Sequence, residues 1–357
     1  MTLPGYRVEF YNHPTERQKK VFAEFLDRYN LEYENTVDMS LKVLDEATDE
    51  MVGTGSIEGK VIKCMAIDPK RRGEGLSAFI LSELVKALHS LGRNHIFVFT
   101  NPKNIEETSG NVFAGFKIVS KTDEIVLLEM GSTLITDYLD DLKFKTRGIK
   151  ENYSAPFGAI VVNCNPYTLG HQYLIETASK ECSFVYVFVV SEDKSVFPTD
   201  VRVKLVKEGT KHLDNVLVIE GGEYIISPAT FPRYFLKECD DVSLAQARLD
   251  ITIFADHIVS LLGITRRYVG EEPYCMVTKS YNQAMVEILL PKGVELKIIP
   301  RRMKNGDAIS ASKVRELLHE RRIDDTIDYI PPSTYNFLKS KEGKMIIEKI
   351  VKGNSRH

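Results

Sequence analysis

The feature that most constrains the fold of this chain is an apolar run that ends in a glycine-containing turn and passes into a helix. Residues 157–163 (FGAIVVN) have the length and composition of a strand buried on both faces. The turn that follows, residues 165–171, has the sequence NPYTLGH and leads into apolar residues at helical spacing. A glycine lets the main chain approach a ligand closely, and the N–H groups at a helix start can receive phosphate oxygens. This segment therefore predicts an α/β sheet with a phosphate site at a strand end.

A second turn of the same kind lies downstream, at residues 309–315 (ISASKVR). Ser310 and Ser312 provide hydroxyls at a helix start, and Arg315 adds a guanidinium in the first turn of that helix. In the first turn, Thr168 and His171 are the candidate catalytic residues. A histidine at that position can hydrogen-bond a phosphate whose negative charge grows during reaction.

The pattern between and around these turns favours a doubly wound parallel sheet, because predicted strands alternate with predicted helices. The predicted strands are 157–163, 184–190, 216–220, 267–270 and 295–299, and the predicted helices are 168–182, 199–211, 243–262, 280–290 and 312–320. Ligands bind such sheets at the carboxyl ends of the strands, where the strand order reverses. Both turns occupy strand ends, as this geometry requires.

Other polar residues and glycines near strand ends are candidates for nucleotide binding. They are Asn165, Gly170, Lys194, Gly270 and Glu271, of which Lys194, in the loop after the predicted strand 184–190, is also a catalytic candidate. A solvated loop lysine is the alternative interpretation of Lys194, and Glu271 is as readily an exposed glutamate. Cys164 directly precedes the first turn, in the same loop, without an obvious base partner, so we expect a buried thiol.

The N-terminal third has its own strand-to-helix turn, residues 66–76 (AIDPKRRGEGL). Arg72, Gly73 and Gly75 in this turn could hold a pyrophosphate by main-chain N–H groups. The surrounding pattern predicts helices at 17–29 and 75–91 and strands at 36–43, 51–57, 60–67, 95–100 and 124–130. We expect a first domain at 1–132, a linker at 133–153 with a short helix, and a second domain at 154–357.

Composition excludes several classes of protein. The 357 residues carry 47 Lys and Arg against 50 Asp and Glu, so a nucleic-acid footprint is not expected. Five scattered cysteines without a CxxC pair fit a reducing compartment. The N-terminus lacks a signal-peptide pattern, and the apolar runs are too short to span a membrane. These observations predict a soluble cytoplasmic protein.

The motifs resemble known families. The turn at 66–76 looks like the Q/RxxGxG/A turn of the GNAT acetyltransferase fold, with Lys70 at its first position. The turns at 165–171 and 309–315 resemble the T/HxGH and ISxTxxR signatures of the nucleotidyltransferase superfamily. A GNAT-like α+β domain followed by a Rossmann-like, HUP-type nucleotidyltransferase domain resembles the citrate lyase ligase family over nearly the whole chain.

That resemblance implies a substrate set. The family uses ATP and acetate to acetylate the thiol of a prosthetic group on the citrate lyase acyl carrier subunit, through acetyl-adenylate, and releases AMP and pyrophosphate. It implies Mg²⁺ bound mostly by nucleotide and water, because the sequence contains no metal cluster of its own. The loop with Lys194 and Arg202 resembles one that contacts phosphates in phosphopantetheine adenylyltransferases. The GNAT-like turn would then bind the coenzyme-A-like prosthetic arm.

Two other functions stay open on the residues alone. One is a nucleotidyltransferase that makes a nucleotide-linked cofactor, because the first motif is shared with such enzymes. The other is a non-catalytic regulatory protein that binds coenzyme A and a nucleotide. Whether the GNAT-like domain is catalytic or only binds its ligand is likewise open.

Overall fold

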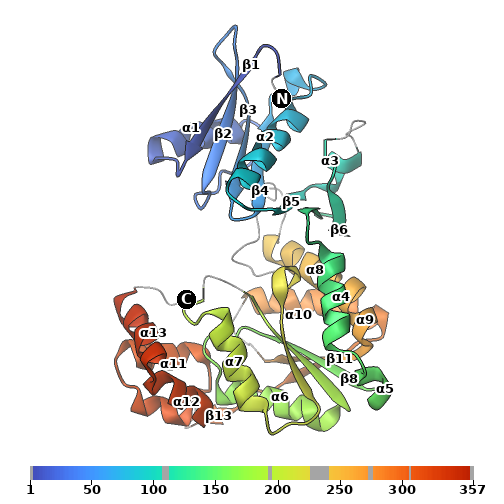
Figure 1. The fold of residues 1–357 in the computed structure, drawn as a ribbon, viewed down its shortest axis with the longest axis vertical. Coiled ribbons are helices and arrows are strands. Elements are labelled where there is room, and N and C mark those ends of the chain that lie inside the picture. The colour runs from blue at the N-terminus through green and yellow to red at the C-terminus, as the bar shows by residue number, and fades with distance from the viewer. Residues whose placement is uncertain are drawn as a thin grey trace. The chain divides into compact units, whose positions relative to one another are not determined.

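The structure, a computed structural model, describes residues 3–106, 112–191, 195–225, 241–271, 276–304 and 307–353. The chain divides into two compact units, Met1–Tyr138 with Phe231–Thr252, and Leu139–Thr230 with Ile253–His357. Each unit is built around its own sheet (Figure 1). These two units are defined by contacts within the folded chain. The predicted domain boundaries at 132 and 154 stay a prediction.

The first unit contains a seven-stranded sheet in the order β1-β2-β3-β4-β5-β7-β6. Its strands are β1 (Tyr6–Asn12), β2 (Met39–Asp45), β3 (Met51–Glu58), β4 (Val61–Ile67), β5 (His95–Thr100), β6 (Lys117–Lys121) and β7 (Val126–Gly131). Neighbouring strands are antiparallel except β4 and β5, which are parallel and pair only at Val61–Phe97 and Ile62–Val98. This mixed sheet with helices on it is the α+β fold that the sequence predicts.

Helices cover both faces of this sheet. They are α1 (Glu16–Asp27), the 3-10 turn η1 (Pro69–Arg71), α2 (Leu76–Ser90) and α3 (Pro102–Glu106), joined by α8 (Val242–Ile253) up to Thr252. A side chain on Gly53 would collide with Ile80 of α2, since an added Cβ would lie 2.8 Å from its Cδ1. Phe22 and Leu26 of α1 pack with Cys64 in a separate cluster. The sheet therefore has apolar layers on both faces.

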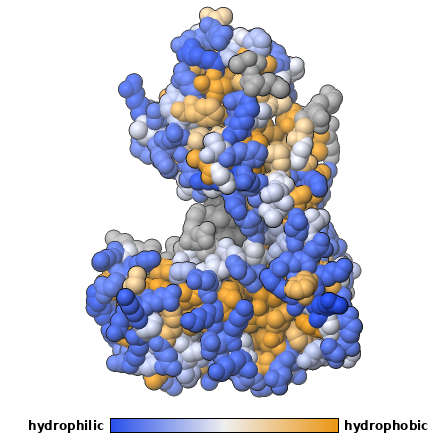
Figure 2. All heavy atoms as spheres, in the orientation of Figure 1, coloured by the Kyte–Doolittle hydropathy of each residue, from blue (hydrophilic) through white to orange (hydrophobic). Residues whose placement is uncertain are grey.

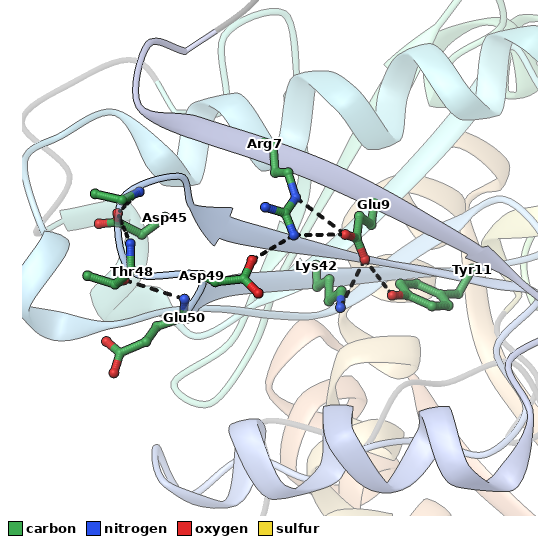
Figure 3. A network of polar contacts seen from close by, with 9 residues as sticks. Arg7, Glu9, Tyr11, Lys42, Asp45, Thr48, Asp49 and Glu50 are labelled. Atoms are coloured by element: carbon green, nitrogen blue, oxygen red, sulfur yellow. Dashed lines mark hydrogen bonds and ion pairs between the residues drawn. The ribbon is translucent and has the colours of Figure 1, made fainter.

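A network of charged side chains crosses β1 and β2 (Figure 3). The Glu9 carboxylate accepts a hydrogen bond from the Tyr11 hydroxyl at 2.6 Å and pairs with Lys42 at 2.9 Å. Arg7 bridges Glu9 at 3.3 Å and Asp49 at 2.7 Å. The Tyr11 hydrogen bond, followed by the Lys42 contact, lowers the pKa of Glu9 to about 2.

The second unit contains a five-stranded parallel sheet in the order β10-β9-β8-β11-β12. Its strands are β8 (Phe157–Val162), β9 (Phe184–Val189), β10 (Val216–Glu220), β11 (Ile264–Gly270) and β12 (Glu295–Ile299), with a small hairpin of β13 (Met303–Lys304) and β14 (Asp307–Ala308). Successive strands run outward from β8 in one direction and then from β11 in the other. The sheet is therefore doubly wound, and its strand order reverses between β8 and β11.

The helices of this unit precede, connect and follow its strands. They are α4 (Ile135–Lys145), α5 (Ile149–Asn152), α6 (Leu169–Glu181), α7 (Thr199–Thr210), the π-helical stretch η3 (Phe254–Val259), α9 (Ser260–Leu262), α10 (Met276–Leu289), α11 (Ala311–His319), α12 (Pro332–Lys339) and α13 (Lys341–Lys352), with 3-10 turns η2 (Gly222–Tyr224), η4 (Leu290–Lys292) and η5 (Asp324–Asp328). Helix α4 begins in the first unit and ends in the second.

Both faces of the parallel sheet are covered, so its central strands are apolar throughout. All six residues of β9 are buried. Ile175 of α6, Leu205 of α7 and Val314 of α11 belong to one cluster with the strands. Phe254 meets Phe188 of β9 edge-to-face, with ring centroids 5.9 Å apart. Burial on both faces explains why these strands are continuous apolar runs rather than alternating ones.

The predicted elements agree with the structure except at a few places. Strands β5, β10 and β12 have the predicted bounds. Strand β1 was not predicted, and β11 begins three residues before its predicted start at 267. The missed start consists of Ile264, Thr265 and Arg266, of which Thr265 and Arg266 are only partly buried, so no continuous apolar run marks it.

The surface is mixed. The face in view is largely hydrophilic on both units, with hydrophobic residues gathered in patches (Figure 2). Among the helices that the structure describes, none has both the length and the apolar character needed to cross a bilayer.

Candidate functional site

Thr168 organises the first motif, because it lies in the loop after β8 and caps the start of α6. The Thr168 main-chain N–H donates to His171 Nδ1 at 3.1 Å, and the Thr168 hydroxyl lies 2.9 Å from the same nitrogen. The His171 N–H in turn donates to Thr168 Oγ1 at 3.4 Å. A main-chain N–H can only donate, so Nδ1 must be the unprotonated nitrogen. The ring proton therefore lies on Nε2, which becomes a hydrogen-bond donor.

The electrostatic surroundings of His171 favour the same neutral form. Burial, and secondarily the positive charge of Arg301, lowers its pKa to about 4. The Tyr167 ring is stacked on the imidazole at 6.0 Å between centroids. At neutral pH the side chain is thus an uncharged imidazole of fixed tautomer whose Nε2–H is its donor.

The two motifs touch each other at Gly170. A Cβ on Gly170 would lie 2.9 Å from the carbonyl oxygen of Ile309, the first residue of the second motif. That distance leaves no space for a side chain against main chain, so a glycine is required here. The Leu169 N–H donates to the Tyr329 carbonyl at 2.9 Å, which fastens the same helix start to the C-terminal part of the chain.

The second motif holds the first through Arg315. Ser310 caps α11 by accepting from the Lys313 N–H at 3.2 Å. One turn later, Arg315 Nη1 donates to the Asn165 carbonyl at 2.5 Å, and Nη2 donates to Ser312 Oγ at 3.3 Å. Burial lowers the pKa of Arg315. Phosphate binding by Arg315 stays a prediction, whereas the structure shows that this residue ties the two motifs together.

Asn165 and Arg202 lie beneath the first turn. The Asn165 side-chain oxygen accepts from the Phe197 N–H at 3.1 Å. The Arg202 guanidinium is fully buried and donates to protein oxygens of Phe197, Asn163, Val190 and Thr199 at 2.6–2.9 Å. These bonds give Arg202 a scaffolding role that the sequence did not suggest. A direct contact of either residue with a nucleotide stays a prediction.

Two further candidates lie at the end of β11, next to the motif that follows β8. The register pairs Tyr268 with Ile160, which brings Gly270 level with the last residue of β8. A Cβ on Gly270 would meet nothing within 4 Å, and Glu271 is exposed. This edge therefore has space above it. Lys194, the remaining candidate of the second unit, lies outside the described residues.

Sequence reasoning missed two residues of this region. Arg301 follows β12, its Nε donates to the Glu271 carbonyl at 2.8 Å, and its charge acts on His171. Tyr167 is fully buried, and a Cβ on Gly209 would lie 2.2 Å from its ring. The position of Arg301 directly after a predicted strand was the available signal, but no motif includes it. Cys164 is buried, as expected, and burial raises its pKa.

The turn of the first unit has its own geometry. Gly73 and Gly75 have φ values of +87° and +81°, which L side chains rarely adopt. Arg71 pairs with Asp45 of β2 at 2.5 Å, which fixes the turn to the sheet. Arg72 is exposed at the same turn. The three predicted residues thus share one exposed strand-to-helix turn, while the other described candidates gather at the edge of the second sheet.

A doubly wound sheet with two helix starts at its switch point is the architecture of a nucleotide-binding α/β protein. The family model described as "Citrate lyase ligase C-terminal domain" matches residues 157–338. The [Citrate [pro-3S]-lyase] ligase of Klebsiella pneumoniae is 39% identical over 344 residues, which are 95% of this chain and 97% of that protein. The enzyme of the same name from Escherichia coli K12 is 35% identical over 89% of each chain.

The chain therefore belongs to the citrate lyase ligase family. Among solved structures, Thermotoga maritima TmcAL bound with alpha-thio ATP matches with a TM-score of 0.39 and 11% identity, over 54% of this chain and 57% of that one.

Proposed function

We propose that this protein is an AMP-forming ligase that acetylates the thiol of the prosthetic group on the acyl carrier subunit of citrate lyase, using ATP and acetate. One observation carries the proposal. In a chain of this family, the two phosphate motifs meet at the switch point of the parallel sheet, through Gly170 against Ile309 and Arg315 against Asn165. Adenylation of a carboxylate needs such a cradle around the phosphates of ATP.

The chemistry has two displacements. An acetate oxygen attacks the α-phosphorus of ATP, the bond to the bridging oxygen breaks, and pyrophosphate leaves. The thiolate of the carrier arm then attacks the carbonyl carbon of acetyl-adenylate, a thioester forms, and AMP leaves. In the first step, negative charge grows on phosphate oxygens, and the Nε2–H of His171 is a fixed donor for that charge. Because His171 is neutral, it stabilises the charge by hydrogen bonding without a proton transfer.

Mg²⁺ would neutralise the phosphate charge when bound. No group of three His, Cys, Asp or Glu side chains converges within the described ranges. In this proposal the ion is held mainly by phosphate oxygens and water, with the protein contributing at most a carboxylate such as the exposed Glu271.

The first unit would capture the carrier's arm. That arm derives from dephospho-coenzyme A and contains a pyrophosphate, and the exposed turn with Gly73 and Gly75 presents main-chain N–H groups at the start of α2. In this proposal the unit binds the arm and takes no part in activating acetate. The buried free thiols Cys64, Cys164 and Cys182 are consistent with a cytoplasmic location.

Pyrophosphate exchange tests the proposal. The protein is incubated with ATP, Mg²⁺ and labelled pyrophosphate, with and without acetate, and label appearing in ATP is counted. Exchange that requires acetate supports the ligase. Exchange that requires a nucleotide monophosphate instead supports an enzyme that makes a nucleotide-linked cofactor. No exchange with any of these substrates contradicts the proposed activity and leaves a binding protein.

A further inference from the structure

Arg301 lies at the carboxyl edge of the parallel sheet, in the chain that leaves β12. Its Nε donates to the Glu271 carbonyl at 2.8 Å, and the Glu271 N–H donates to the Ile299 carbonyl at 2.9 Å. These bonds tie the end of β11 to the end of β12. The base of the guanidinium is therefore fixed beside the strand end where the sheet reverses its order.

The chain that begins at Arg301 returns to the first motif. The Ile309 N–H donates to the carbonyl of Arg302 at 3.0 Å, and the Ile309 carbonyl oxygen is the atom that excludes a side chain from Gly170. Arg301 is thus connected through two short steps to the helix start that contains His171. Its charge reaches the imidazole and contributes to the lowered pKa of His171.

The other donors at this helix start are neutral. His171 offers Nε2–H, because its Nδ1 accepts from the Thr168 N–H. Leu169 donates to Tyr329 and the His171 N–H donates to Thr168, whereas the Gly170 N–H has no acceptor within the described part of the chain. Two neutral donors stabilise the charge on a phosphate oxygen by hydrogen bonding, and a guanidinium would add a full positive charge beside the departing pyrophosphate.

The other described cations near this edge also have protein partners, and Lys313 of the second motif pairs with Glu316 at 3.1 Å. The Arg202 guanidinium is fully buried among its protein acceptors. Arg315 is directed to the Asn165 carbonyl and the Ser312 hydroxyl. Arg301 is likewise bound to the protein, since its Nε donates to the Glu271 carbonyl, and this bond holds the side chain beside the end of β11.

We propose that Arg301 contacts the phosphate chain of ATP and, with the His171 imidazole and the Gly170 N–H, completes the set of donors around it. This inference rests on the proposed function, because it takes ATP as the ligand. Arg301 lies outside both phosphate motifs, so neither motif predicts this role.

Three variants of the full-length protein test the assignment. Arg301→Ala removes the cation, Arg301→Lys keeps the charge without the planar fork, and Arg302→Ala is the matched control at the adjacent, exposed arginine. The measurements are equilibrium affinities for ATP and for adenosine, and acetate-dependent pyrophosphate exchange. Circular dichroism verifies folding, and Arg301→Gln, which keeps most of the side chain's bulk, replaces Arg301→Ala if the alanine variant does not fold.

We expect Arg301→Ala to bind ATP about 10-fold or more weakly, since a hydrogen bond to a charged group contributes about 1.5–3 kcal/mol. Exchange should fall about 100-fold, as for removal of one donor to developing charge. Arg301→Lys should recover part of both losses, and Arg302→Ala should stay within about 2-fold of wild type. Adenosine affinity should be unchanged in every variant, because adenosine has no phosphate.

The outcomes separate this inference from the proposed function. A wild-type protein that binds ATP but shows no acetate-dependent exchange contradicts the proposed activity, while the ATP and adenosine affinities still decide whether Arg301 contacts phosphate. Unchanged ATP affinity in Arg301→Ala overturns the assignment. So does an equal loss of ATP and adenosine binding, which would indicate damage to the site as a whole.

Discussion

Arg315 of α11 donates to the main-chain carbonyl of Asn165 at 2.5 Å, a contact between residues 150 positions apart. Through this bond the second motif supports the loop of the first motif. The planar guanidinium also reaches Ser312 Oγ, so one side chain positions both turns. A residue whose expected role was phosphate binding thus also determines where the other phosphate turn lies.

Arg315→Ala should therefore impair nucleotide use more than loss of one phosphate contact alone. We expect a lower apparent affinity for ATP and a loss of stability of about 1–3 kcal/mol, because the Asn165 carbonyl loses its partner in a partly buried place. Exchange kinetics and thermal unfolding measure the two effects. Arg322→Ala is the control, since the guanidinium of that arginine is exposed and pairs with Asp325 and Glu320. Unchanged stability and unchanged ATP use in Arg315→Ala would contradict the positioning role.

His171→Ala should lower acetate-dependent exchange by about 100-fold or more while the fold is kept, because one preorganised donor to developing charge contributes ~3–4 kcal/mol. His212→Ala, at an exposed histidine that contacts Glu176 at 3.1 Å, is the control and should retain near-normal exchange. Normal turnover by a folded His171→Ala protein would show that the imidazole does not act on the phosphates.

The lowered pKa of His171 has a consequence for stability. Its pKa is about 4 in the folded protein against 6.5 for an ordinary histidine, so the folded state binds fewer protons between these values. The contribution of the neutral ring is fully present above about pH 6.5 and is lost as the pH falls toward 4. Relative to His171→Gln, the wild-type protein should therefore lose stability over this window, as measured by denaturant unfolding at pH 7 and pH 4.5. A constant difference between the two proteins would contradict the lowered pKa.

Gly170→Ala tests the contact between the motifs. The added Cβ would lie 2.9 Å from the Ile309 carbonyl oxygen, and because that oxygen belongs to the main chain the two turns must separate. We expect a loss of stability of about 1–3 kcal/mol, as for overpacked sites, together with weaker ATP binding. Gly270→Ala is the control for stability, because its Cβ would meet nothing within 4 Å. Equal stability of both variants would show that the turns can move apart without cost.

The sequence predicts the place of a residue in the site when its role depends on its neighbours along the chain. Thr168, His171 and Ser310 act at helix starts next to them in the chain, so their pattern predicted their places. Arg202 could not be assigned in this way, because its burial depends on four partners that only the folded sheet brings around it. Arg301 could not be assigned from the sequence either, because its partner Glu271 follows a different strand, β11.

Strand β1 shows the same limit within the fold. Its exposed and partly buried residues include Arg7, Glu9 and Tyr11. Arg7 and Tyr11 contact the Glu9 carboxylate, and Lys42 of β2 completes its ion pairs. No apolar run marks such a strand, because what stabilises it lies on the neighbouring strand. By contrast, the sequence predicts β8 and β9 because each is a continuous apolar run.

The last prediction concerns the proposed capture of the carrier arm by the first unit. Gly73 lies in an exposed turn with φ of +87°, and nothing lies within 4 Å of the place where its Cβ would be. Gly73→Asp puts a side chain and a negative charge where the proposed pyrophosphate lies. We expect it to impair acetylation of the carrier thiol while acetate-dependent pyrophosphate exchange continues, because the phosphate motifs that activate acetate belong to the other unit. Thioester formation on the carrier and label exchange measure the two reactions in the same preparation.

The control for this variant is Gly92→Asp. Gly92 also has a positive φ, +72°, and space around its Cβ, so the substitution costs similar backbone strain at a different turn of the same unit. Loss of carrier acetylation in Gly73→Asp but not in Gly92→Asp would separate the effect on the arm from general strain. If both variants acetylate the carrier normally, the turn does not hold the arm. If Gly73→Asp loses pyrophosphate exchange as well, the first unit takes part in activating acetate, and the division of labour proposed for the two units is wrong.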